Sequence, residues 1–116
     1  MNKEEAIAIV KESIQRGSST PCTWQDDRDK YIEEESIKLL QHIIDPVEVQ
    51  ITRESFSYGT LEKIKGAAVF GIAKRENHWL VFNPESKAFS LAFGKTPSDL
   101  EILGFDSNDV LAEWLG

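Results

Sequence analysis

The densest group of residues capable of chemistry is an acidic stretch, residues 24–35, in which six carboxylates follow a tryptophan. Its first three carboxylates, Asp26, Asp27 and Asp29, are oxygen ligands of the kind that Mg²⁺ and Ca²⁺ bind. A calcium loop of the EF-hand type needs glycine at its sixth position, but counting from Asp27 places Ile32 there. A two-metal nuclease could use scattered acids, but their spacing does not separate such a site from a solvated run. We therefore predict no metal site and no cofactor.

Other catalytic groups are sparse. The chain has two histidines, His42 and His78, and one cysteine, Cys22. The histidines do not form a His-Glu-x-x-His zinc motif, and the cysteine has no local signature of a catalytic thiol. The glycines form neither a phosphate-binding loop nor a nucleophile elbow. We therefore predict no catalytic residue and favour a protein that is not an enzyme, although active sites also assemble from residues distant in sequence.

The acidic stretch has the composition of a protein-binding surface. Interfaces are enriched in tryptophan, tyrosine and arginine, and this stretch offers all three beside a loop rich in serine. The candidate partner surface consists of Trp24, Asp26, Asp27, Asp29 and Tyr31. The simpler interpretation is that Trp24 and Tyr31 cover the end of the core, which is the commoner fate of large aromatic residues in a small domain.

A small-molecule site or a small active site at the sheet edge is the alternative. Small-molecule sites are mostly apolar with a few polar groups. The polar groups that such a site could use are Asp26, Asp27, His42, Lys74, Arg75 and His78. A solvent-exposed hairpin turn explains the last three of these residues more simply.

The charge of the chain constrains its partners. Its 116 residues carry a formal net charge of −7, and 41% of them are hydrophobic, as in an ordinary globular domain. Because affinity for nucleic acid comes from Lys and Arg that neutralise phosphates, we expect no nucleic-acid partner and consider a basic protein the natural partner. The sequence shows neither a signal peptide nor a long apolar run, and its single cysteine suits a reducing compartment, so we expect a soluble cytoplasmic protein without a membrane partner.

The spacing of apolar residues predicts two N-terminal helices. Asn2 and Glu5 form a capping pattern, and Gly17 ends the first helix. The second helix runs from about residue 26 to Ile44 and is stopped by Asp45-Pro46, because a residue before proline avoids helical angles.

Four strands follow, near residues 47–53, 67–74, 79–83 and 88–93. In the first, three branched residues alternate with polar ones, and the last three are joined by short turns as a meander. Thr96-Pro97 could begin a short helix to about Leu103, although residues 100–103 could instead be extended, and a final helix follows a cap at Asp106 or Ser107.

This order of elements is segregated rather than alternating. It predicts a single α+β domain, residues 1–116, with an about four-stranded, mainly antiparallel sheet and helices packed on it. The leading functional hypothesis is a non-enzymatic interaction or regulatory module, such as an immunity, inhibitor or adaptor protein, that binds a basic partner. A homodimer is also open, because an edge strand such as Val47–Thr52 could pair with a second copy.

Overall fold

Helix α1, Lys3–Gln15, begins where the sequence predicts, because Asn2 and Glu5 form a capping box. The Asn2 side chain accepts a hydrogen bond from the Glu5 amide at 2.8 Å, and the Glu5 carboxylate accepts one from the Asn2 amide at 3.4 Å. Ala6 and Val10 of this helix face the core.

The computed structural model describes residues 1–17, 28–56, 59–64, 66–104 and 106–115.

Helix α2, Arg28–Gln41, ends before the predicted boundary at Ile44. Strand β1, Ile43–Glu48, begins there instead, so the prediction that the helix reaches Ile44 is wrong. Ile43 is buried in a strand pairing, which suits a β-branched side chain better than the last turn of a helix. Pro46 lies within β1, and this is tolerated because β1 is at one end of the sheet order.

The predicted strand near residues 47–53 is two strands in the structure. Strand β1 ends at Glu48 and β2, Ile51–Glu54, follows after a bend at Val49 and Gln50. The Val49 amide donates to Val69 O at 3.0 Å, whereas the Gln50 amide donates to Pro97 O at 2.8 Å. The chain therefore changes its pairing partner between two adjacent residues.

The remaining elements include the predicted meander. In chain order they are α3 (Thr60–Ile64), β3 (Phe70–Arg75), β4 (His78–Asn83), β5 (Ala88–Thr96), β6 (Asp99–Ile102) and α4 (Val110–Leu115). Strands β3, β4 and β5 pair antiparallel, as the short turns predict. Residues 99–102 are extended rather than helical, because Thr96 pairs with Asp99 across a tight turn and thereby adds β6 to the meander.

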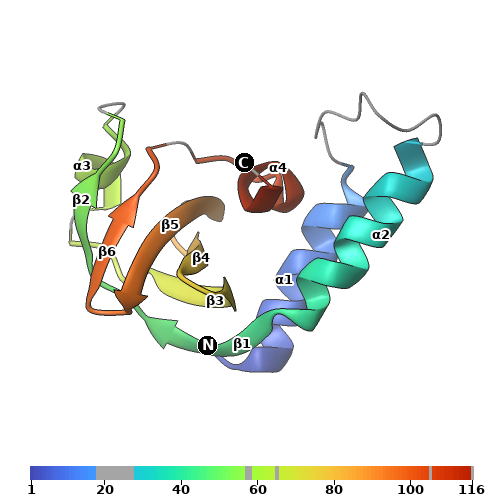
Figure 1. Ribbon diagram of the computed structural model, residues 1–116, viewed down its shortest axis with the longest axis horizontal. Coiled ribbons are helices and arrows are strands. Elements are labelled where there is room, and N and C mark those ends of the chain that lie inside the picture. The colour runs from blue at the N-terminus through green and yellow to red at the C-terminus, as the bar shows by residue number, and fades with distance from the viewer. Residues whose placement is uncertain (18–27, 57–58, 65, 105, 116) are drawn as a thin grey trace.

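The sheet has six strands in the order β1-β3-β4-β5-β6-β2, and β2 runs parallel to β6. The prediction of an α+β fold with an about four-stranded, mainly antiparallel sheet is therefore correct in fold class and only roughly correct in the sheet, which has six strands and one parallel pair among four antiparallel ones. Because β1 and β2 lie at opposite ends of the order and are nearly continuous in the chain, the sheet must curl until its two ends meet. Figure 1 shows this curled sheet beside the helices.

The two faces of the curled sheet hold separate clusters of buried residues. Helices α1, α2 and α4 cover one face (Figure 1), where the cluster includes Val10, Leu39, Leu80, Phe89 and Trp114. The other face holds a cluster of Val49, Ile64, Val69, Trp79, Val81, Ala92, Leu100 and Ile102. Partly buried Val47 and Ile51 pack against that second cluster, which confirms that the alternating residues of the predicted first strand share a face. None of the helices formed by the described residues is long and apolar enough to cross a membrane.

Candidate functional site

The predicted partner surface is only partly covered by the described residues. Trp24, Asp26 and Asp27 lie outside them. Asp29 is exposed in the first turn of α2. Tyr31, two residues further on, is only 6% exposed and therefore belongs to the buried part of the molecule, as the simpler interpretation predicts. A partner could reach Asp29 but not most of the Tyr31 ring.

The polar residues of the alternative site are divided between the two faces of the sheet. Arg75 lies with its guanidinium carbon 5.4 Å from the centre of the Trp114 ring, and the His42 ring lies 5.9 Å from the same ring. Arg75 is also the register partner of His78 in the β3–β4 pair. Lys74 lies on the opposite face, with Nζ 4.7 Å from the centre of the Trp79 ring, so the structure brings together three of the four described residues of this set.

A cavity of about 360 Å³ lies where the chain bends between β1 and β2. One wall is the bend itself, one is α3, and one is the segment that leads from α3 into β3. Its lining residues are Glu48, Val49, Gln50, Ile51, Leu61, Glu62, Ile64, Gly66, Ala67 and Val69. Ligand pockets generally range from about 300 to 1,000 Å³, so this cavity lies near the lower end of that range.

Two contacts hold the α3 wall in place. The Glu54 carboxylate accepts a hydrogen bond from the Leu61 amide at 2.7 Å, which satisfies one of the free amides at the start of α3. At the other end, the Ala67 amide donates to Ile64 O at 2.9 Å. Gly66 has a φ of 84°, a left-handed conformation that glycine adopts without steric cost, and it turns the chain toward β3.

Aliphatic side chains line part of the cavity, beside polar groups that make up more of its exposed lining. Val49, Ile64 and Val69 are buried members of the second cluster, and Ile51 and Leu61 pack against it. Each of these side chains is therefore fixed by the interior of the curled sheet. The cavity is an extension of that interior toward solvent, and these packed side chains help to set its shape.

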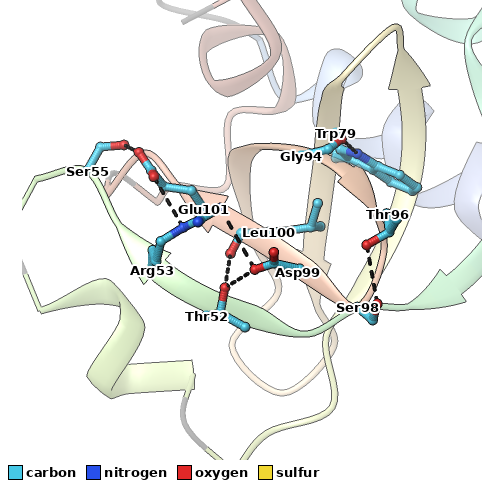
Figure 2. A network of polar contacts seen from close by, with 10 residues as sticks. All are labelled: Thr52, Arg53, Ser55, Trp79, Gly94, Thr96, Ser98, Asp99, Leu100 and Glu101. Carbon is cyan, nitrogen blue, oxygen red and sulfur yellow. Dashed lines mark hydrogen bonds and ion pairs between the residues drawn. The ribbon is translucent and has the colours of Figure 1, made fainter.

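The charged groups of the cavity are two carboxylates. Glu48 and Glu62 are both exposed. Within the described part of the chain, neither side-chain carboxylate has a hydrogen bond or an ion pair. The carboxylates between β2 and β6 differ in this respect, as Figure 2 shows. There, Arg53 lies 3.8 Å from Asp99 and 3.4 Å from Glu101, and Glu101 also accepts a hydrogen bond from Ser55.

A cavity lined by aliphatic side chains and by two carboxylates that have no partner among the described residues is chemically suited to a long cationic side chain. Lysine and arginine place their methylene groups on apolar surface and keep the charged group at the polar rim. A metal ion is less suitable, because no three His, Cys, Asp or Glu side chains lie together anywhere in the described residues.

Sequence reasoning missed this cavity. The alternation of residues 47–52 predicts that Glu48 is on the polar side of its strand, and the segment 61–65 is predicted only as a connection. No local pattern indicates that Glu48 and Glu62 belong to the same cavity, because a helix, a bend and a crossing of the sheet bring them together.

Comparisons with known proteins give no further guidance, since no family model, no curated protein and no solved structure matches the chain. Its geometry and charge therefore carry the functional argument.

Proposed function

We propose that this protein is a non-enzymatic interaction module that binds a basic protein by accepting a lysine or arginine side chain into the cavity at the β1–β2 bend. The single observation that supports this proposal is the pair of carboxylates of Glu48 and Glu62, which have no partner among the described residues and line a cavity together with aliphatic side chains. The net charge of −7 supports it further, because a negative field speeds the approach of a basic partner.

The expected binding mode separates the roles of the residues. The aliphatic side chains of the lining contact the methylene groups of the inserted side chain, and Glu48 and Glu62 attract its charged group. Gln50, exposed at the bend, offers an amide oxygen as a further acceptor. Because the carboxylates are exposed, their contribution should be sensitive to salt.

The proposal is tested with the double variant Glu48→Gln/Glu62→Gln. A short tetralysine or tetra-arginine peptide is titrated into ¹⁵N-labelled protein, and amide chemical shifts are followed. For the wild-type protein we expect saturable shifts at residues that line the cavity. The double variant should bind the peptide about tenfold more weakly or worse, the result of losing roughly 1.4 kcal/mol of charged contacts.

The matched control is Glu33→Gln/Glu34→Gln. These two exposed glutamates of α2 also lack an ion pair among the described residues, and they do not line the cavity. Their removal changes the net charge by the same amount and should leave most of the binding intact. Equal losses in the two double variants would mean that only the overall charge attracts the peptide, and the proposed cavity would then be wrong.

A further inference from the structure

Arg75 differs from the other arginines whose side chains the structure describes. Arg16 lies 3.1 Å from Glu12, and Arg53 lies between Asp99 and Glu101. Arg75 is exposed and has no carboxylate partner in the described residues, and its guanidinium group is instead over Trp114. In a protein with a net charge of −7, an arginine without an acidic partner is unexpected.

Both histidines of the chain lie near this arginine. His78 is directly across from Arg75 in the β3–β4 pair, so the two side chains leave the sheet on the same face and their Cβ atoms are about 5 Å apart. His42 follows the last residue of α2, and its carbonyl oxygen accepts a hydrogen bond from the Lys74 amide at 3.1 Å. Its ring is next to Trp114.

The ring of His78 has a defined orientation. Its Nδ1 atom is buried without a hydrogen-bond partner among the described residues, and the ring packs edge-on against Phe93 with a centroid distance of 5.0 Å. A buried nitrogen without an acceptor favours the tautomer that carries its hydrogen on Nε2. The half-exposed ring therefore has Nε2–H as its available donor.

We infer that Arg75, His78 and His42 form a binding site for the oxyanion of a phosphate monoester. The guanidinium group has a planar fork of donors that matches phosphate geometry, and the Trp114 ring below it limits its motion. The two histidines add ring nitrogens near it, His78 as its register partner and His42 beside the same Trp114 ring. This site lies on the helix-covered face of the sheet, apart from the cavity at the β1–β2 bend, and it does not depend on the proposed function.

The acidic side chains around the site favour a single phosphate group over a long polyanion. Glu76 follows Arg75 at the turn, Glu113 precedes Trp114 in α4, and Glu101 is already bound to Arg53 and Ser55. These charges oppose a long polyanion such as nucleic acid, which must cover a large surface. A single phosphate group needs only the local contacts of Arg75 and the histidines.

The direct test titrates inorganic phosphate into ¹⁵N-labelled protein at constant ionic strength, with chloride as the balancing anion. We expect saturable shifts of the Trp114 indole and of the imidazole nitrogens of His78 and His42. Arg75→Gln should weaken phosphate binding by about tenfold or more, because it removes the charged fork but keeps a long side chain on Trp114.

The matched control is Arg53→Gln. The register places Arg75, His78, Phe93, Glu101 and Arg53 in one row across the sheet, so both arginines share the same face and differ in having carboxylate partners. Arg53→Gln should leave phosphate binding unchanged. His78→Gln is a second variant, expected to weaken binding even if Arg75→Gln does not fold. Identical shifts with chloride alone, or equal losses in Arg53→Gln and Arg75→Gln, would overturn the inference.

Two further titrations identify the source of the phosphate. One uses free phosphoserine and the other a short peptide that contains phosphoserine, each with the unphosphorylated form as control. Tighter binding of the phosphopeptide would assign the site to a modified partner protein, and equal binding would assign it to small phosphate esters. Both results support an oxyanion site, whereas equal binding of the unphosphorylated forms contradicts it.

Discussion

Glu113 shows how the environment of one residue sets its protonation. It lies half-buried in α4 and accepts a hydrogen bond from the Ser107 hydroxyl at 3.0 Å. Burial raises the pKa of this carboxyl above its ordinary value of 4.5, and the hydrogen bond from Ser107 opposes that rise. The negative charges of Asp106 and Asp109 raise the pKa of Glu113 further.

The substitution Glu113→Gln should therefore stabilise the protein at neutral pH. A raised pKa means that the folded state binds the proton more tightly than the unfolded chain, so wild-type stability is full below pH 4.5 and falls as pH rises through the folded-state pKa. Glutamine avoids that loss and still accepts from Ser107. Thermal unfolding should give a higher Tm for the variant at pH 7 and a difference that shrinks toward about pH 4. Glu34→Gln is the exposed control, and a difference that grows in acid would contradict this account.

At the scale of elements, the short helix α4 depends on α1. It has only six residues, and a helix of that length is not stable by itself in water. Ser13 of α1 is 2% exposed; its hydroxyl donates to Asn108 O at 2.6 Å and accepts from the Val110 amide at 3.0 Å. One serine thus connects the two helices and satisfies the first amide of α4.

Ser13→Ala should destabilise the protein by about 1–3 kcal/mol, because the buried Val110 amide is left without an acceptor. Hydrogen exchange should show a larger loss of protection in α4 than in β4. Ser36→Ala is the control, since Ser36 is also buried but, among the described residues, its hydroxyl bonds only to Ile32 O of its own helix, at 2.6 Å. A cost for Ser13→Ala no larger than that for Ser36→Ala, measured by urea unfolding, would show that the contact between helices is not important.

Local sequence predicts some elements and fails at others for identifiable reasons. The capping box of Asn2 and Glu5 acts within one turn, so it determines the start of α1 without the rest of the chain. A short turn likewise joins β4 to β5, as the predicted meander requires. The end of α2 fails because Ile43 gains more from pairing with β3 than from a further helical turn. Residues 99–102 resolve as a strand because β5 and β2 supply partners on both sides.

At the scale of the whole molecule, the curl of the sheet is the feature on which the cavity depends. Strand β2 meets β6 in a seam with polar side chains on its surface, and Thr52 donates to Asp99 at 2.5 Å there (Figure 2). Inside the curl, Gly71 lies against Trp79 and against Val49 at the bend. Trp79 also donates from Nε1 to Gly94 O at 2.9 Å, which fixes the indole across the interior.

Gly71→Ala should therefore destabilise the protein by about 1–3 kcal/mol through overpacking. A methyl group at this position would lie 2.9 Å from Trp79 Cε3 and 3.2 Å from Val49 Cγ1. The cost should be smaller in a Val49→Ala background, because the truncated side chain leaves room for the shift. Urea unfolding of the four proteins in this double-mutant cycle measures the coupling, and fully additive costs would show that Gly71 and Val49 do not share the interior of the curl.

The sequence predicts some properties of the candidate sites, and only the structure shows the others. The sequence alone predicts an acidic chain with few catalytic groups, and it indicates that Tyr31 is more suited to the core than to a surface. It does not predict that Glu48 and Glu62 share a cavity, or that His42 and Arg75 both lie beside Trp114. Each of these pairs is far apart in the chain, and no periodicity connects its members.

The sequence by itself determined what acts over a few residues: the helix cap at Asn2, the meander of β3 to β5, and the net charge. Only the tertiary structure decided where α2 ends, how residues 43–54 divide between two partners, and that β2 pairs parallel with β6. The physical reason is that caps and turns satisfy backbone groups locally, whereas strand pairing and burial are decided by which distant segments supply a partner and an apolar surface.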